Sequence, residues 1–329
     1  MDAVGAGQAR VLILIPVFND WSSVARLLTE LDAIFTRQGR NADALLVDDG
    51  SSQELSDHAT PLTLTRITSI SILRLRRNVG HQRAIAIGLA YAEANGACDV
   101  AIVMDGDGED KPEDVPRLMA ELERRGGRYV VFAERTRRSE GILFVTMYGL
   151  YRAVHWLLTG ERVRVGNFSA VPAHALRRLT TSSDLWNHYA AAVFKSRVPY
   201  CTIPTTRGER YSGTSHMNYV ALVTHGLSAM SVFGERIGVR LIVATLGFAT
   251  ILLLAFVAML SYRLVTGGAM PNWTVYAVAL LVLVFFQALS ASLSFVFIIL
   301  GGRDSSTFLP LRDYSYFVHD VVGWPTERR

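Results

Sequence analysis

Short apolar runs alternate with longer stretches of helical periodicity over much of the chain. Five apolar runs have the length and composition of buried strands: 11–17, 44–47, 70–75, 100–104 and 129–133. Three intervening stretches place their apolar residues on one helical face: 21–35, 81–93 and 112–124. Strands and helices that alternate in this way predict an α/β fold, with a mostly parallel sheet that helices cover on both faces.

Two long apolar runs near the end of the chain predict a transmembrane hairpin. Residues 241–262 carry no charge, and as a helix they extend over about 33 Å, enough to cross a hydrocarbon core of about 30 Å. A second uncharged run begins at Trp273, and we assign its span to residues 274–300. The residues between the runs include glycines and a proline, which break helices. Two buried helices of a soluble protein are the alternative, which the length of the runs disfavours.

The distribution of basic residues predicts the orientation of this hairpin. Four arginines flank its outer ends: Arg236, Arg240, Arg303 and Arg312. The loop between the two spans carries only Arg263. The positive-inside bias therefore predicts that residues 1–240 and the tail face the cytoplasm, at the inner or plasma membrane.

Residues 218–240 mix apolar, charged and histidine side chains at near-helical spacing. We interpret them as an amphipathic interfacial helix, with a packing helix of the globular domain as the alternative. The chain then divides into four segments: a globular domain at 1–217, the interfacial segment at 218–240, the hairpin at 241–300 and a cytoplasmic tail at 301–329. Alternating aromatic and polar residues at 310–324 predict a strand added to a second subunit of a homo-oligomer, with disorder as the alternative.

Composition and charge exclude several classes of protein. Half of the 329 residues are apolar and 19% are charged, which excludes an intrinsically disordered chain. Residues 1–240 carry 28 basic and 25 acidic side chains, and so weak a bias gives no support to nucleic-acid binding. The two cysteines, Cys98 and Cys201, have neither zinc-ligand spacing nor a disulfide framework. A reducing, cytoplasmic setting fits them best.

Polar residues cluster where the predicted strands end. They are Asn19 and Asp20 after the first strand, Asp48 and Asp49 after the second, Asn78 after the third, Asp105 and Asp107 after the fourth, and Glu134 and Arg135 after the fifth. Ligands of such sheets bind beyond the carboxyl ends of the strands. Five strand ends are therefore expected to contribute to one crevice.

The acidic run DGDGED at residues 105–110 carries the strongest chemical signal. Two carboxylates in an Asp-x-Asp turn repel each other unless a cation lies near them. Mg²⁺ or Mn²⁺ is the predicted cation, because Mg²⁺ typically binds one or two carboxylates together with diphosphate oxygens. The chain contains no glycine loop with the lysine of an NTPase. A solvated acidic loop is the alternative, which the position at a strand end disfavours.

Four motifs occur in a fixed order: PVFND at 16–20, VDDGS at 47–51, NVGHQ at 78–82 and MDGDGED at 104–110. Together they resemble the family 2 inverting glycosyltransferases, which have the Rossmann-like GT-A fold. The amphipathic segment and hairpin that follow are similar to the polyprenyl-phosphate branch of that family, the dolichyl-phosphate mannose synthase-like and bactoprenol glucosyltransferase-like enzymes. Three further stretches match: 135–140, 165–169 and 207–217. The resemblance covers nearly the whole chain.

The resemblance implies roles for individual residues. Asp105, Asp107, Arg138 and Arg210 would be catalytic, and Asp107 and Glu109 would bind Mg²⁺ or Mn²⁺. Arg138, Ser215 and His216 would bind the lipid phosphate. The nucleotide sugar would be bound by ten residues: Pro16, Phe18, Asp20, Asp48, Asp49, Asn78, Gln82, Asp105, Gly106 and Arg135. Bidentate guanidinium contacts to phosphate are the physical reason to expect the arginines.

Three positions depart from the family pattern. Glu109 stands where relatives often have Gln, which keeps an oxygen ligand and adds a charge. His216 replaces a common Lys, so that a fixed charge becomes one that titrates near neutral pH. Asn167 replaces the Asp of a Gly-Asp-Phe motif, so a carboxylate sometimes proposed as a base is missing.

The resemblance implies an in-line displacement, with inversion, at the anomeric carbon of a nucleotide-diphosphate sugar by an oxygen of undecaprenyl or dolichyl phosphate. A phosphomonoester has a second pKa of about 6 and needs no general base at neutral pH. A lipid hydroxyl acceptor is the alternative and would need one, for which Asp184, Glu140 and Glu161 are the candidates. A membrane-anchored sugar-nucleotide binding protein without turnover is a second alternative, which the Asp-x-Asp pair and the arginines disfavour. The hairpin would hold the site where the lipid phosphate arrives.

Overall fold

The computed structural model describes residues 9–53, 55, 61–135, 142–161, 165–212, 219–267, 273–302 and 308–324. The chain divides into two compact units. The sheet unit comprises residues 1–147, 163–232 and 308–329, and the helical unit comprises residues 148–162 and 233–307.

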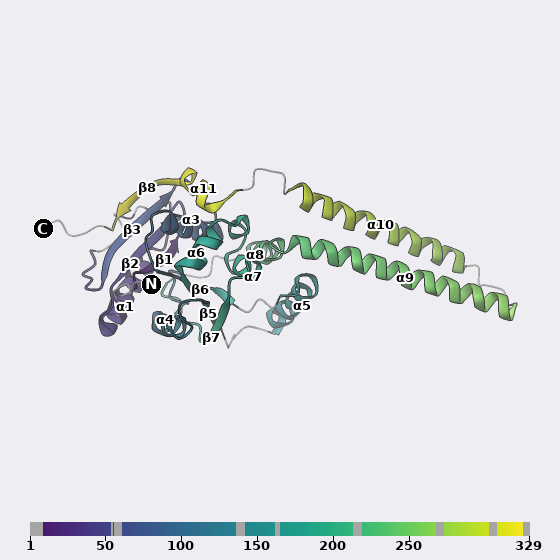
Figure 1. Cartoon of the computed structure of the whole chain (residues 1–329), viewed down its shortest axis with the longest axis horizontal. Coiled ribbons are helices and arrows are strands. Elements are labelled where there is room, and N and C mark those ends of the chain that lie inside the picture. The colour runs from purple at the N-terminus through teal and green to yellow at the C-terminus, as the bar shows by residue number, and fades with distance from the viewer. Residues whose placement is uncertain are drawn as a thin grey trace, which may run out of the picture. The chain divides into compact units, whose positions relative to one another are not determined.

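A single mixed sheet forms the centre of the sheet unit (Figure 1), and its described strands follow the order β7-β5-β6-β4-β1-β2-β3-β8. The strands are β1 (Val11–Val17), β2 (Ala42–Asp48), β3 (Ile67–Leu75), β4 (Val100–Val103), β5 (Val130–Arg135), β6 (Val165–Pro172), β7 (Tyr200–Thr205) and β8 (Val318–Gly323). The five strands predicted from the sequence correspond to β1 to β5.

The strand directions confirm an α/β fold with a mostly parallel sheet. β1 pairs in parallel with β2 and β4, β2 with β3, and β5 with β7. β6 runs antiparallel to both β4 and β5, so that β5 points the same way as β4. β8 is antiparallel to β3. The carboxyl ends of β1 to β5 and β7 therefore lie at one edge of the sheet, and β6 begins at that edge.

Helices cover both faces of the sheet, as the sequence predicts. α1 (Trp21–Gln38) and α4 (Val115–Arg124) pack on one face. α3 (His81–Ala94), α6 (Ala173–Thr180) and α7 (Tyr189–Lys195) pack on the other. In β1, Ile13 and Ile15 belong to the first core and Leu12 and Leu14 to the second, because successive side chains of a strand point to opposite faces.

The tail completes the chain's own sheet. After α11 (Pro310–Asp313), β8 runs along the outer edge of β3, where Figure 1 shows it in yellow. Arg74 of β3 forms an ion pair with Asp320 of β8. The ring of Trp324 packs edge-on against Trp21, with 6.3 Å between the ring centroids. The predicted strand is thus present, but it pairs within the chain rather than with a second subunit.

Residues 218–240, which the sequence suggested as one interfacial helix, do not form a single helix. α8 (Tyr219–Ser231) ends before Val232 and belongs to the sheet unit. α9 begins at Gly234 and continues without interruption through the first apolar run. Three short 3₁₀ helices occur in the described part of the sheet unit: η1 (Pro112–Asp114), η2 (Ser183–Trp186) and η3 (Tyr314–Tyr316).

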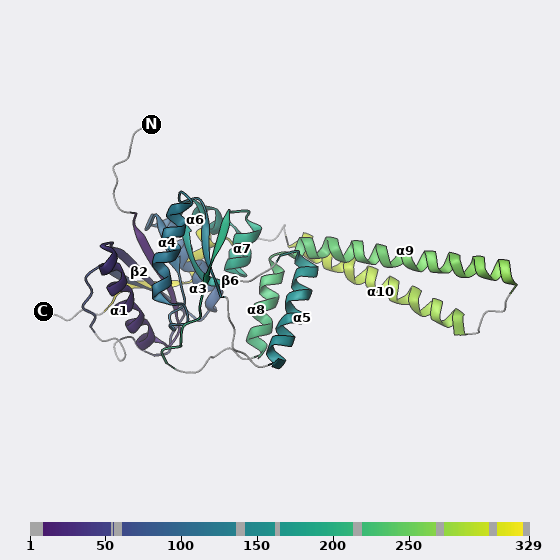
Figure 2. The ribbon, with the colours of Figure 1, turned by 90° about the horizontal axis from the view of Figure 1, so that it is seen from below.

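The helical unit contains two helices that are long and apolar enough to cross a membrane. α9 (Gly234–Thr266) and α10 (Trp273–Gly301) run side by side (Figure 2). Only 6% of the most apolar window of each helix is buried, so neither is the core helix of a soluble domain. Gly234 and Gly238 allow close approach, because a Cβ at either position would lie 2.8 Å from a side chain of α10.

The carboxyl end of α5 (Ile142–Thr159) is fixed to the start of α9 within the helical unit. Nη1 of Arg240 donates to the carbonyl oxygens of Trp156 and Leu157 at 3.2 and 2.6 Å. Arg236 forms an ion pair with Glu161 at 2.6 Å. The last carbonyls of a helix need partners beyond its own turns. The guanidinium of Arg240 donates to two of them, of which the carbonyl of Trp156 also accepts from the N–H of Gly160 at 2.8 Å.

Candidate active site

Asn19 joins the loop after β1 to the loop after β2. Its backbone adopts a left-handed conformation with φ of 54°, which Asn tolerates better than most residues. Its Oδ1 atom accepts hydrogen bonds from the backbone N–H groups of Ser52 and Gln53 at 2.8 and 3.0 Å. This turn leaves the side chain of Phe18 50% exposed beside the strand end.

Two aspartates shape the loop after β2. Oδ1 of Asp48 accepts a hydrogen bond from the N–H of Ser51 at 2.9 Å. The two carboxylate oxygens of Asp49 accept from the N–H groups of Val79 and Gly80 at 2.7 and 2.9 Å. Asp49 therefore ties the ends of β2 and β3 together. Burial raises the pKa of its carboxyl to about 6, although the two backbone hydrogen bonds act in the opposite direction.

The acidic turn, residues 105–110, follows β4 and is held from within by Asp110. One oxygen of Asp110 accepts from the N–H of Asp105 at 3.0 Å, and the other accepts from Arg135 at 3.0 Å. Burial, together with the neighbouring Asp105, raises the pKa of Asp110 to about 7. Arg135, at the end of β5, thus lies against the turn.

The arginine loop, residues 206–212, lies across the acidic turn. The N–H of Gly208 donates to the carbonyl of Glu109 at 2.8 Å, and that of Tyr211 donates to the carbonyl of Asp107 at 2.9 Å. A Cβ on residue 208 would lie 2.3 Å from the carbonyl oxygen of Gly108, so only glycine fits there.

Arginines neutralise the two carboxylates predicted to bind a metal. Arg210 forms an ion pair with Asp107. Nε of Arg207 donates to Glu109 at 3.0 Å, and Arg135 lies 3.7 Å from the same carboxylate. The carboxylates of the acidic turn thus pair with arginines, and guanidinium groups can also bind phosphate.

His81 and Asn167 enclose Asp105. Nε2 of His81, in the first turn of α3, lies 3.1 Å from Oδ1 of Asp105. Burial lowers the pKa of His81, but the carboxylate of Asp105 outweighs it and raises that pKa above its ordinary value. The same pairing holds the pKa of Asp105 below its usual range in spite of burial. Asn167 lies near the start of β6 and therefore at this same edge of the sheet.

The model of the family "Glycosyl transferase family 2" matches residues 12–180, which is more than half of the chain. The chain belongs to this family. The matched residues extend from the start of β1 to the end of α6 and include the acidic turn, His81 and Asn167.

This glycosyltransferase is similar over most of its length to two bacterial sugar transferases. It is 28% identical over 300 residues to undecaprenyl-phosphate 4-deoxy-4-formamido-L-arabinose transferase of Klebsiella pneumoniae subsp. pneumoniae, and the alignment covers 86% of this chain and 84% of the relative. It is 26% identical over 304 residues to the transferase of the same name from Enterobacter sp., with the same shares covered.

Among solved structures, glucosyl-3-phosphoglycerate synthase from Mycobacterium tuberculosis, in complex with Mn²⁺, UDP-glucose and phosphoglyceric acid, aligns with a TM-score of 0.49 at 14% identity. That alignment covers 70% of this chain and 80% of the synthase.

The structure brings most of the predicted site residues of the glycosyltransferase to one edge of the sheet. This acidic edge is formed by the loops that follow the parallel strands. It contains Pro16, Phe18, Asp20, Asp48, Asp49, Asn78, Gln82, Asp105, Gly106, Asp107, Glu109, Arg135 and Arg210. Arg138, Ser215 and His216 lie outside the described residues. The individual roles of all these residues remain predictions.

Three residues of the acidic edge, His81, Asp110 and Arg207, were not assigned a role from the sequence. His81 directly follows Gly80 in the NVGHQ motif, and Asp110 ends the acidic run. The place of each residue in its motif could therefore have indicated a role in the site. What the sequence did not show was their pairing, His81 with Asp105 and Asp110 with Arg135.

The candidate bases for a hydroxyl acceptor are engaged elsewhere. Asp184 forms an ion pair with Lys195 at 2.9 Å. Glu161 pairs with Arg236 inside the helical unit. Glu140 lies outside the described residues.

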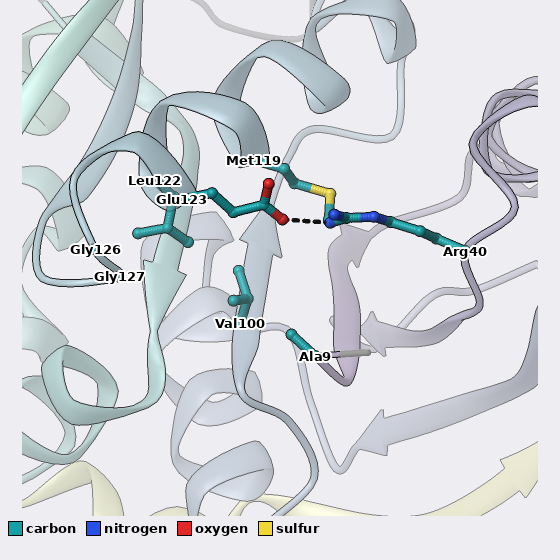
Figure 3. A pocket seen from close by; sticks show the side chains of 8 residues that line it. All are labelled: Ala9, Arg40, Val100, Met119, Leu122, Glu123, Gly126 and Gly127. Atoms are coloured by element: carbon teal, nitrogen blue, oxygen red, sulfur yellow. Dashed lines mark hydrogen bonds and ion pairs between the residues drawn. The ribbon is translucent and has the colours of Figure 1, made fainter. Parts of the chain in front are cut away.

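A cavity of about 310 Å³ lies at the opposite edge of the sheet (Figure 3). It is lined by Val100 at the start of β4 and by Met119 and Leu122 of α4, and the Arg40–Glu123 ion pair of 2.6 Å borders it. Because ligands of parallel sheets bind at the carboxyl ends of strands, this cavity is not the candidate site.

Proposed function

We propose that this glycosyltransferase moves a sugar from a nucleotide-diphosphate sugar to a polyprenyl phosphate such as undecaprenyl phosphate, with inversion at the anomeric carbon. One observation carries the proposal: the alignment with the undecaprenyl-phosphate transferase of Klebsiella covers 86% of the chain. A span of that length exceeds the 12–180 match of the family model and includes α9. The similarity therefore extends to a helix long enough to cross a membrane.

The acidic edge suits a nucleotide-diphosphate donor. Phe18 offers an exposed aromatic ring for a nucleobase, and Asp48 offers carboxylate oxygens to its polar groups. Arg135, Arg207 and Arg210 can neutralise a diphosphate. In this proposal Asp107 and Glu109, which now pair with these arginines, would bind the metal ion when the donor binds.

Asp107 and Glu109 fit Mg²⁺ or Mn²⁺ as a pair of oxygen ligands on one turn. No group of three or more His, Cys, Asp or Glu within the described ranges is arranged to hold a metal. Two carboxylates completed by diphosphate oxygens are how Mg²⁺ is usually held in phosphate chemistry. Bound there, the cation would stabilise the charge on the departing nucleoside diphosphate.

The acceptor phosphate needs no general base, because a phosphomonoester is already largely dianionic at neutral pH. This agrees with the amide of Asn167 at the site. The residues of the chain then act by orientation and charge: Asp105 and His81 contact the donor, and the arginines hold the leaving diphosphate.

We further propose that α9 and α10 anchor the enzyme in the membrane, with residues 1–217 and the tail in the cytoplasm. The arginines in the first two turns of α9 and after α10 support this orientation by the positive-inside rule. Anchoring raises the rate of encounter between the acidic edge and a lipid phosphate. The interfacial role of residues 218–240 remains part of this proposal.

The deciding experiment uses the full-length protein purified in detergent, with Mn²⁺ or Mg²⁺. A panel of radiolabelled nucleotide sugars is tested against undecaprenyl phosphate and, separately, against a lipid alcohol. We expect transfer to the phosphate alone, and Asp107→Ala is expected to reduce it by roughly a hundredfold or more, as for loss of a group that stabilises transition-state charge.

The matched control is Asp99→Ala, which removes an exposed carboxylate just before the start of β4, at the opposite edge of the sheet. This variant should retain full transfer. Transfer to the alcohol alone would contradict the proposal, because that reaction requires a base.

A further inference from the structure

Two side-chain amides connect the backbone of α7 to the centre of the acidic edge. The N–H of Tyr189 donates to Oε1 of Gln82 at 2.8 Å. Nε2 of Gln82 donates to Oδ1 of Asn167 at 2.9 Å. Nδ2 of Asn167 lies 2.9 Å from Nε2 of His81, which is itself 3.1 Å from Asp105.

The direction of this amide chain is fixed by its first member. A backbone N–H can only donate, so the atom of Gln82 that faces Tyr189 must be the carbonyl oxygen. The NH₂ group of Gln82 then faces Asn167, which must present its oxygen in return. The NH₂ group of Asn167 consequently donates to Asp105. Nε2 of His81 faces the same carboxylate and does not accept from Asn167, although the two nitrogens lie 2.9 Å apart.

The first member of the chain is rigidly held. Tyr189 is completely buried, and its hydroxyl lies 2.6 Å from Oγ of Ser169. Ser169 in turn donates to the backbone carbonyl of Asn167 at 2.9 Å. The orientation of both amides is therefore set by the N–H of Tyr189, and reversing one amide alone would leave a donor facing a donor or an oxygen facing an oxygen.

We propose that Gln82 and Asn167 are positioning residues: the amide chain that begins at Tyr189 directs the NH₂ group of Asn167 at the His81–Asp105 pair and thereby fixes the carboxylate that meets the donor. This inference rests on the proposed function for the identity of the donor. It reassigns Gln82, whose amide is used inside the protein, from donor binding to orientation.

The chemistry of the edge explains an amide at position 167. A carboxylate there would place a second negative charge against Asp105, beside a turn that already contains Asp107, Glu109 and Asp110. An amide gives Asp105 a neutral donor without adding charge. Asn167 thus contributes orientation and not proton abstraction.

The decisive comparison is Gln82→Glu against Gln82→Met in the full-length protein. Glu keeps the hydrogen bond from Tyr189 but turns an oxygen toward Asn167, which must then reverse and present its own oxygen to Asp105. Met has a similar length and makes neither bond. If Gln82 served only the stability of the fold, Gln82→Glu would reduce activity less than Gln82→Met, because Glu retains the hydrogen bond from Tyr189.

Orientation predicts the opposite order. Gln82→Glu should lower kcat by roughly ten- to a hundredfold, the effect of one lost hydrogen bond to a charged group, and by at least as much as Gln82→Met. Its thermal midpoint should nevertheless be no lower than that of Gln82→Met. If activity follows the order of stability, with Gln82→Glu close to the unmodified enzyme, the proposal is overturned.

A second readout does not depend on sugar transfer. Calorimetry with UDP and with GDP in the presence of Mn²⁺ measures nucleotide affinity in the same variants, and we expect the same ranking for whichever nucleotide binds. If the unmodified protein binds nucleotide but transfers no sugar to undecaprenyl phosphate, the proposed function fails, while the ranking of affinities still tests the positioning role.

Asn167→Asp separates orientation from catalysis by a base. We expect it to lower transfer by roughly tenfold or more, because it replaces a donor to Asp105 with a like charge. Asn95→Asp, at the carboxyl end of α3, adds the same charge far from the acidic edge and should leave transfer unchanged. A gain of activity in Asn167→Asp would show that this position serves as a base and would overturn the proposal.

Discussion

Asp49 illustrates how a single residue in the acidic edge can be structural rather than catalytic. Its carboxylate spans two backbone N–H groups of the loop after β3 and is buried. Gly50 follows it with φ of 71°, and a Cβ there would lie 2.6 Å from the backbone nitrogen of Asn78. The VDDGS motif therefore encodes a close contact between two loops, whatever its role toward a nucleotide.

Asp49 should make stability depend on pH. Its folded pKa of about 6 lies above the ordinary value of 3.8, so the protonated form is favoured by folding and the associated stability is lost as pH rises from 4 to 6. The loss amounts to about 3 kcal/mol at 1.4 kcal/mol per pKa unit. Asp49→Asn cannot ionise. The thermal midpoint of the unmodified protein minus that of this variant should therefore fall as pH rises from 4 to 7. A difference that is constant or grows over this range would show the prediction to be wrong.

The ion pair between Arg210 and Asp107 predicts competition between the arginine loop and a metal. Arg210→Gln keeps a polar side chain but removes the charge that neutralises Asp107. Mn²⁺ should therefore bind the nucleotide-free variant more tightly, by roughly twofold to fivefold, as expected for a partly exposed pair worth up to about 1 kcal/mol. Titration followed by electron paramagnetic resonance measures the free ion. Arg40→Gln, whose partner Glu123 lies at the opposite edge of the sheet, is the matched control, and unchanged affinity in Arg210→Gln would contradict the prediction.

At the scale of elements, the sequence predicted β1 to β5 and the helices between them because their apolar periodicity is regular. β6 was not expected as a strand: residues 165–169 were noted only as a motif, and periodicity cannot reveal that a strand inserts antiparallel between β4 and β5. The site was predictable where its residues follow strands directly, as Asp48 and Asp105 do. The contacts of Arg207 and Arg210 arise from a loop about a hundred residues away in sequence, which no local pattern encodes.

The division of residues 218–240 between α8 and α9 has the same cause. The amphipathic composition of this segment is compatible with one helix, and only the tertiary structure places a break at Val232 and Phe233. The arginines at its end were interpreted as topological signals. In the structure, Arg236 and Arg240 also have specific partners on the α5 segment.

Arg240→Ala should loosen the carboxyl end of α5. The substitution removes two hydrogen bonds to carbonyls of the last helical turn, at a cost of about 1 to 3 kcal/mol to local stability. Hydrogen–deuterium exchange should become faster in the α5 segment, at residues 154–161. Arg263→Ala, near the other end of α9, is the control and should leave this exchange unchanged. Equal protection in both variants would mean that Arg240 does not hold the helix.

At the scale of the whole molecule, β8 protects the outer edge of the sheet. An unpaired edge such as that of β3 exposes backbone N–H and carbonyl groups to pairing with other chains. Because β8 follows α10 in the chain, the strand that completes this edge of the sheet comes after both apolar helices in the sequence. The tail therefore supplies the edge strand of the sheet, although the family model matches only residues 12–180.

Deletion of residues 318–329 should lower the thermal midpoint and promote aggregation, because it exposes β3. Asp320→Ala, which removes only a half-exposed ion pair with Arg74, should cost less than about 1 kcal/mol. Light scattering during thermal unfolding distinguishes the two. If the deleted protein remains as stable and as monodisperse as Asp320→Ala, β8 does not protect the edge.

The position of β8 also governs the order of events on the ribosome. Arg74 and Asp320, which meet across the edge, are separated by 246 residues, and at about 5 to 20 residues per second their synthesis is separated by roughly 12 to 50 s. During that interval the nascent sheet has an open side, because both apolar helices are synthesised before β8. The sheet can reach its finished form only after α9 and α10 have been made, so any pause in their synthesis lengthens the time in which nascent chains can pair with one another.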